Sequence, residues 1–142
     1  MEDQMPAWHL EIPDSTNALH QRREFVRYLE SCGATGDYAA AELIFGEIVG
    51  NAMIHAPGPI AVSVEWVDGS ATLRVYDAGP PIDTSHVRMF PDPFGEFGRG
   101  LPIVNELSGR SLSSAVYVDG KTISAELPVR LSTQRTRPPH LR

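Results

Sequence analysis

The segment from Asp37 to His55 constrains the fold of this chain more than any other. It is rich in Ala, Leu, Ile and Glu and stops at Ala56-Pro57-Gly58, which predicts one long helix. Apolar residues occupy nearly all sides of that helix, so we expect other elements to bury it. Because the chain has 142 residues, and a domain usually takes roughly 100–200, the cover has to come from within one domain.

Segments that are predicted to form strands precede and follow this helix in the sequence. Segments of alternating or short apolar character predict strands at 8–12, 60–66, 71–76, 111–118 and 121–129. The last four form two β-hairpins, because Asp68-Gly69 and Asp119-Gly120 are turn sequences. Shorter helices are expected from about 15 to 33 and over 101–107. Helices and antiparallel hairpins in this order predict a two-layer α+β sandwich and not a parallel βαβ sheet.

Two segments do not fit regular structure. Prolines and glycines interrupt residues 77–100, and a loop of this length in a small domain is usually functional or disordered. We expect it to be disordered without ligand. Residues 131–142 are basic, contain prolines and have few apolar side chains, so we expect a disordered tail. The folded domain is therefore placed at residues 7–130.

Composition restricts the partners and the compartment. The formal net charge is −6, so the chain as a whole repels phosphate backbones, and we expect no direct nucleic-acid binding. Lys121 is the only lysine, which leaves phosphate contacts to arginine, backbone N–H groups or a metal. The single cysteine, Cys32, fits a reducing, cytoplasmic setting. The acidic N-terminus and the absence of a long apolar run predict neither export nor membrane insertion.

Polar side chains interrupt the apolar helix on one side. Glu47 and Asn51 are four residues apart and His55 follows, so all three share a face. A buried carboxylate and amide need partners. A hydrogen-bond network to a loop would satisfy them, and from spacing alone this is the commoner case. The alternative is a magnesium-nucleotide site, in which one Asn oxygen and phosphates hold Mg²⁺ and Glu47 is free to act as a base.

Two further segments are candidates for ligand contacts. Asp77 and Gly79 end a predicted strand, where the carboxylate can reach a ligand or simply form an Asp-x-Gly turn. Gly98-Arg99-Gly100 precedes a predicted helix, a place that suits phosphate but also suits a flexible hinge. From the residues alone both alternatives stay open.

One apparent motif is misleading. Gly120-Lys121-Thr122 looks like the end of a P-loop, but that pattern needs glycine at position 115, which is Ala115. It also lies between two predicted strands and not before a helix. The histidines lack the spacing of a metal site such as H-E-x-x-H.

In chain order these segments form a set: Glu47-Ile-Val-Gly-Asn51-Ala-Met-Ile-His55-Ala, Val75-Tyr-Asp77-Ala-Gly79-Pro80, Phe97-Gly98-Arg99-Gly100-Leu101-Pro-Ile-Val104 and Gly120-Lys-Thr122. The set resembles the GHKL ATPase superfamily, which has the Bergerat ATP-binding fold of gyrase, heat-shock 90 chaperones and sensor histidine kinases. The size and the Asn-Ala-x-x-His-Ala pattern are most similar to bacterial anti-sigma factor serine/threonine kinases. The resemblance covers about residues 7–130 and implies a mixed, mostly antiparallel sheet with helices on one face.

The resemblance also implies roles for individual residues. Asn51 would coordinate Mg²⁺ at the phosphates of ATP, and Glu47 would be the general base. Asp77 would accept a hydrogen bond from the adenine amino group, Gly79 would make room for the base, and Thr122 would complete the hydrogen bonds around Asp77. The remaining nucleotide contacts implied are His55, Gly98, Arg99, Gly100 and Leu101.

The function implied is phosphorylation of an antagonist protein on serine or threonine, combined with binding of a sigma factor in a partner-switching system. Arg22, Arg23 and Arg27 are candidate partner contacts, or else a solvated helix face. Relatives of this size are commonly homodimers. The alternative function is a non-catalytic, nucleotide-gated protein-binding switch of the same fold, which the single Gly-x-Gly of the lid favours.

Overall fold

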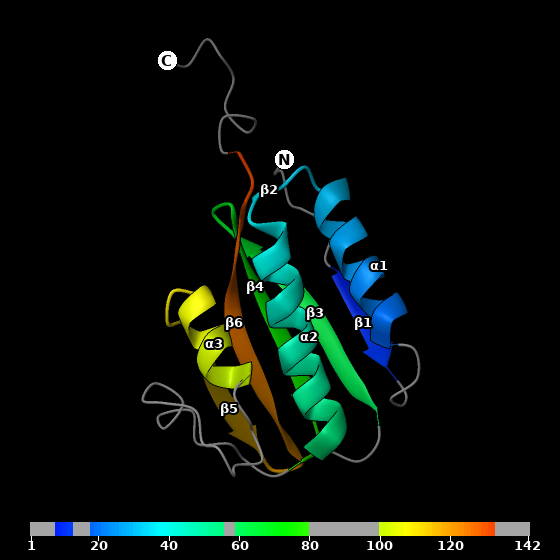
Figure 1. Ribbon diagram of the computed structural model, residues 1–142. Coiled ribbons are helices and arrows are strands. Elements are labelled where there is room, and N and C mark those ends of the chain that lie inside the picture. The colour runs from blue at the N-terminus through cyan, green and yellow to red at the C-terminus, as the bar shows by residue number, and fades with distance from the viewer. Residues whose placement is uncertain (1–7, 13–17, 56–58, 80–99, 133–142) are drawn as a thin grey trace.

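The computed structural model describes residues 8–12, 18–55, 59–79 and 100–132. Its elements, in chain order, are β1 (Trp8–Ile12), α1 (Ala18–Ser31), β2 (Thr35–Gly36), α2 (Tyr38–His55), β3 (Ile60–Val67), β4 (Ser70–Asp77), α3 (Gly100–Leu107), β5 (Ser113–Tyr117) and β6 (Gly120–Arg130) (Figure 1). Residues 1–7, 13–17, 56–58, 80–99 and 133–142 lie outside this description, and with them most of the predicted 77–100 loop.

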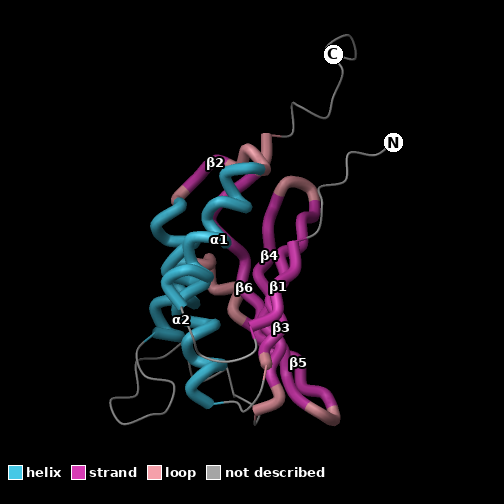
Figure 2. The backbone as a smooth tube through the Cα atoms, turned by 90° about the vertical axis from the view of Figure 1, so that its right-hand side faces the viewer, coloured by secondary structure: helices cyan, strands magenta, loops and turns pink. Residues whose placement is uncertain are grey.

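The strands form one six-stranded sheet, and all of its pairs are antiparallel. The order is β1-β3-β4-β6-β2, and β5 pairs with β6 as well. Figure 2 shows the helices gathered on one side of this sheet, so the molecule has two layers. The predicted α+β sandwich with helices on one face is confirmed.

The core lies between the two layers because alternate residues of each strand point to the same face. On β3 and β4 these are Val62, Val64, Leu73 and Val75, all buried. Phe25 of α1 stacks on Phe45 of α2 with ring centroids 4.5 Å apart. The packing of these side chains fixes α2 across the middle of the sheet.

The long helix α2 begins where the sequence indicates. Asp37 Oδ1 accepts a hydrogen bond from the N–H of Ala40 at 3.0 Å, which caps the helix. The expectation that α2 is buried nearly all round is wrong for one side: Ile54 is 77% exposed. The sheet covers one face of the helix and α1 and α3 flank it, so a stripe that includes Glu47 and Asn51 is only half-buried.

The strand β2 was not predicted, because two residues, Thr35 and Gly36, carry no periodicity. It pairs with the end of β6, where the register of β4 and β6 shifts between Ser70 and Thr72. Pro128 fits there since a proline has no N–H for a regular ladder, and its carbonyl accepts the N–H of Asp37 at 2.9 Å. No helix among the described residues is long and apolar enough to cross a membrane.

Candidate functional site

Asp77 is the last residue of β4, and its side chain is completely buried. Its Oδ1 accepts a hydrogen bond from the N–H of Gly79 at 2.7 Å. This is the Asp-x-Gly turn that the sequence left open as one alternative. The turn orients the carboxylate and fixes Oδ1, and it leaves Oδ2 for another partner.

Lys121 forms an ion pair with Asp77 in the interior. The ammonium Nζ lies 2.6 Å from Asp77 Oδ1, and Lys121 is only 2% exposed. The resemblance implied that Thr122 would complete the hydrogen bonds around Asp77, whereas in the structure Lys121 makes the contact with its carboxylate. Thr122 pairs with Tyr76 across the strands, and neighbouring residues of a strand point to opposite faces, so Thr122 projects away from Asp77.

A signal for Lys121 exists in the sequence. Ile123, Ala125, Leu127 and Val129 are buried at alternate positions of β6, and the same period-two pattern places position 121 on the buried face. A lone lysine at such a position is expected to meet a carboxylate, because burying an unpaired charge is costly.

Gly120 allows β6 to approach Asp77 closely. A Cβ at this position would lie 2.3 Å from the carbonyl oxygen of Asp77 and 2.6 Å from the hydroxyl of Tyr76. That hydroxyl donates to the carbonyl of Asp119 at 3.1 Å. Burial, and after it the nearby Asp119, raises the pKa of Tyr76. The glycine therefore helps to fix the register that puts Lys121 opposite Asp77.

The ion pair is incompletely satisfied. Asp77 Oδ2 is buried and has no hydrogen-bond partner in the described part of the chain. Among the described residues, Asp77 is the acceptor found for Lys121 Nζ, although an ammonium has three N–H donors. A vacant acceptor thus lies beside vacant donors, and a buried polar group without a partner requires an explanation. A planar ligand edge that offers both a donor and an acceptor fits this arrangement, as a nucleobase does.

Glu47 and Asn51 lie on the half-buried stripe of α2. No hydrogen bond joins either side chain to another residue in the described part of the chain. The buried network that was one interpretation of this pair is therefore not formed by the described residues. A carboxylate and an amide that are accessible on one helix face can take a cation and its ligands, which is the other interpretation.

The other predicted site residues divide into two groups. Leu101, the second residue of α3, is buried, and Gly79 is half-buried in its turn. Gly100 is the first residue of α3. His55 ends α2, but its side chain is outside the description, and so are Gly98 and Arg99 entirely. The lid proposed from the sequence therefore stays a prediction.

Asn105 is a buried polar residue that sequence reasoning missed. Its Oδ1 accepts the N–H of Leu112 at 3.2 Å, and its carbonyl accepts the N–H of Arg110. Arg110 has a positive φ of 65°, so this turn relies on the asparagine. Asn105 thus links α3 by hydrogen bonds to the residues that precede β5, the strand that pairs with β6 next to Lys121.

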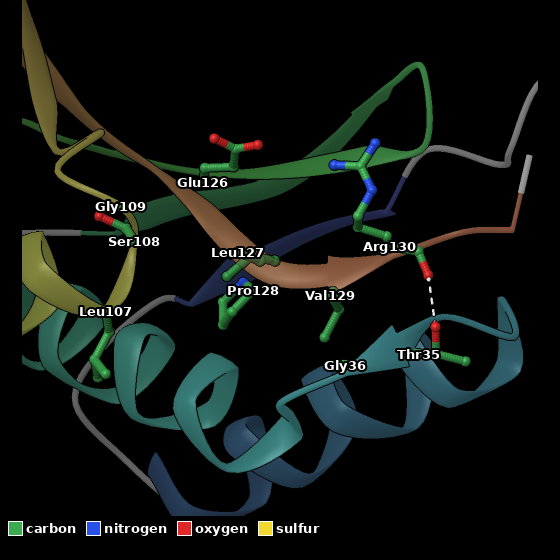
Figure 3. Close-up of a pocket in the computed structure, with 10 residues that line it drawn as sticks. All are labelled: Thr35, Gly36, Leu107, Ser108, Gly109, Glu126, Leu127, Pro128, Val129 and Arg130. Carbon is green, nitrogen blue, oxygen red and sulfur yellow. Dashed lines mark hydrogen bonds between the residues drawn. The ribbon is translucent and has the colours of Figure 1, made fainter.

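A groove of about 450 Å³ opens at the opposite end of β6 from Lys121 (Figure 3). Its lining residues come from β2, the end of α3 and the second half of β6; they are Thr35, Gly36, Leu107, Ser108, Gly109, Glu126, Leu127, Pro128, Val129 and Arg130. None of the predicted site residues is among them. The groove is therefore separate from the site around Asp77.

Comparisons with known proteins agree with this geometry. The profile of the histidine kinase-, DNA gyrase B-, and HSP90-like ATPases matches residues 36–131. The nucleotide-free catalytic domain of histidine kinase ThkA is similar with a TM-score of 0.55 and 18% identity, over 85% of this chain and 97% of that one. Histidine kinase AdeS of Acinetobacter baumannii is similar with a TM-score of 0.55 and 16% identity, over 87% of this chain and 68% of that one. No curated protein sequence matches this chain.

The matched span includes α2, the end of β4 and all of β6, which are the elements that carry Glu47, Asn51, Asp77 and Lys121. The solved structures, at their low identity, support the fold. This chain therefore belongs to the family of histidine kinase-, DNA gyrase B-, and HSP90-like ATPases, and its domain is of the ATP-binding, kinase-like type.

Proposed function

We propose that this chain is an ATP-dependent serine/threonine protein kinase that phosphorylates an anti-sigma antagonist and binds a sigma factor. The observation that supports nucleotide binding is the buried Asp77, whose Oδ2 has no hydrogen-bond partner among the described residues. The choice of serine or threonine and of these partners rests on the resemblance of residues 47–56 to the anti-sigma factor kinases. A cytoplasmic location belongs to the same proposal.

Glu47 and Asn51 would perform the chemistry. Asn51 would offer one hard oxygen to Mg²⁺, a cation that prefers oxygen ligands and would neutralise charge on the phosphates. Glu47 would accept the proton of the serine or threonine hydroxyl. The hydroxyl oxygen would then bond to the γ-phosphorus of ATP. At the same time the bond between the γ-phosphorus and the oxygen that bridges it to the β-phosphorus would break, and ADP would leave. A positioned base of this kind contributes about 10²–10⁴-fold to the rate.

The arginines of α1 differ in exposure: Arg22 is half-buried, whereas Arg23 and Arg27 are exposed. Arg22 Nε lies 3.8 Å from Glu42 Oε2, and its guanidinium lies against Gly46. It therefore supports the packing of α1 on α2. Arg23 and Arg27 are exposed, so these two are the residues we assign to an acidic partner surface.

The experiment is a phosphotransfer assay with ATP labelled in the γ-phosphate and candidate antagonist proteins. We expect label on an antagonist serine or threonine, and Glu47→Gln should reduce the rate by about 10²–10⁴-fold because only the base is lost. Glu42→Gln is the matched control, since Glu42 is a half-buried glutamate on the same helix. Transfer by Glu47→Gln at the wild-type rate would show that Glu47 is not the base.

A second function, the nucleotide-gated switch without phosphotransfer, is favoured by the single Gly-x-Gly of the predicted lid, Gly98-Arg99-Gly100. The same assay separates the two functions. If ATP binds and no antagonist is labelled while ATP changes the affinity for a partner, the switch is the better account.

A further inference from the structure

We propose that Lys121 reads the nucleobase together with Asp77: its ammonium donates to ring nitrogen N1 of adenine while Asp77 Oδ2 accepts from the 6-amino group. This inference rests on the proposed ATP binding and adds a specificity-determining residue to that site. The starting point is that Lys121 Nζ and Asp77 Oδ1 are 2.6 Å apart in the interior, each with hydrogen-bonding capacity left in its group.

The hydrogen bonds that the Asp77 carboxylate already accepts limit which of its oxygens a ligand can contact. Oδ1 already accepts from Lys121 Nζ and from the N–H of Gly79, so Oδ2 is the acceptor that remains. Lys121 supplies donors and no acceptor. The pair therefore presents one acceptor and one donor side by side, in fixed order.

Only some base edges match this order. Adenine offers an amino donor next to the acceptor N1. Hypoxanthine, held in the same position, would place a carbonyl oxygen against Asp77 Oδ2 and an N–H against Lys121, so both contacts become repulsive. Charge-assisted hydrogen bonds are stronger than neutral ones, and an unpaired buried partner adds a penalty. We therefore expect the pair to select the amino-purine strongly.

A neighbouring apolar side chain supports a base at this place. Val116 is the cross-strand partner of Lys121, so the two side chains project from the same face of the sheet. Val116 is 58% exposed. A base bonded to Lys121 could cover this exposed apolar surface, which would favour a planar aromatic ligand over a small polar one.

The first test uses the wild-type protein and ligand analogues, so it does not depend on a variant that must fold. Binding of ATP, 1-deaza-ATP, purine riboside triphosphate, inosine triphosphate and 7-deaza-ATP is measured by calorimetry. We expect at least tenfold weaker binding when N1 or the 6-amino group is removed, and the weakest binding for inosine triphosphate. Removing N7 should change the affinity less than threefold.

The outcomes separate this inference from the proposed function. If ATP and 1-deaza-ATP bind equally while purine riboside triphosphate binds weakly, Asp77 reads the base alone and the role of Lys121 is refuted. If removal of N7 weakens binding as much as removal of N1, the edge assignment is refuted. If the folded protein binds none of these ligands, the proposed ATP binding fails and this inference falls with it.

A second readout uses the fact that Lys121 is the only lysine. Protein labelled with ¹³C and ¹⁵N in lysine gives one ammonium resonance, free of overlap. We expect a large shift of this resonance on saturation with ATP and a much smaller one with 1-deaza-ATP. Equal shifts with the two ligands would contradict a hydrogen bond from Lys121 to N1.

Lys121→Met tests the same contact from the protein side. In this variant ATP and 1-deaza-ATP should bind with equal affinity, because the donor to N1 is gone. A surviving tenfold preference for ATP would overturn the proposal. If the variant does not fold, the analogue series and the resonance on the wild type still decide the question.

Discussion

The two ends of the candidate site differ in how the fold holds them. At the end proposed to bind the nucleobase, Asp77 and Lys121 are buried and form an ion pair between β4 and β6. On α2, Glu47 and Asn51 are half-buried and have no hydrogen bond to another described residue. The difference indicates that the end with Asp77 and Lys121 contributes to the stability of the domain, in addition to the binding role proposed for it. The helix end is available for chemistry at little cost to the fold.

Removing one partner of the ion pair should have the largest effect on stability. Lys121→Met leaves the carboxylate of Asp77 buried without a counter-charge, and we expect a loss of about 3–5 kcal/mol in the free energy of unfolding. Urea denaturation monitored by circular dichroism measures it. Glu47→Gln, the control at the other end, should stay within about 0.5 kcal/mol of wild type. Equal losses for the two variants would remove the contrast between the ends.

Gly120→Ala tests the close approach of β6 to β4. A Cβ there would lie 2.3 Å from the backbone oxygen of Asp77, so a strand has to move. Overpacking of this kind costs about 1–3 kcal/mol, which the same denaturation experiment would detect. The lysine resonance should also shift, because Lys121 is the next residue. An unchanged resonance and unchanged stability would mean that Gly120 does not set the position of Lys121.

The smallest effects are expected from two glycines on the open side of α2. Gly50→Ala should raise the free energy of unfolding by about 0.5–1 kcal/mol, because alanine favours the helix and the new Cβ meets no atom within 4 Å. Gly46→Ala is the matched variant, and it should gain less, since its Cβ would lie 3.1 Å from Arg22 Cζ. A larger gain at Gly46 would show that Arg22 is not seated against α2. Thermal unfolding of the two proteins measures the difference.

The fold could be predicted well where periodicity is long. The apolar run from Asp37 to His55 and the alternation of residues 60–76 specify a helix and a hairpin by themselves, and α2 begins directly after Asp37 as expected. β2 could not be predicted, since two residues carry no period and pair only because the end of β6 passes beside them.

The site was predicted in part. Asp77 is where the sequence placed it, at the end of a strand, and its buried state follows from the alternation of β4. The partner of Asp77 was assigned to Thr122 by resemblance, although strand register gives it to Lys121. Which of two neighbouring residues faces inward depends on a one-residue register, and a motif does not encode it. The roles of Glu47, Asn51 and the lid residues stay predictions.

The central claim is that Asp77 and Asn51 bind the two ends of one Mg²⁺-ATP molecule. Calorimetric titration of Mg²⁺-ATP into wild type, Asn51→Ala and Asp77→Asn tests it without knowledge of any partner protein. Micromolar binding by the wild type, lost in both variants and retained in Glu47→Gln, is the predicted result. No binding by a folded wild-type protein would contradict the account and leave a domain of this fold that acts through protein contacts alone.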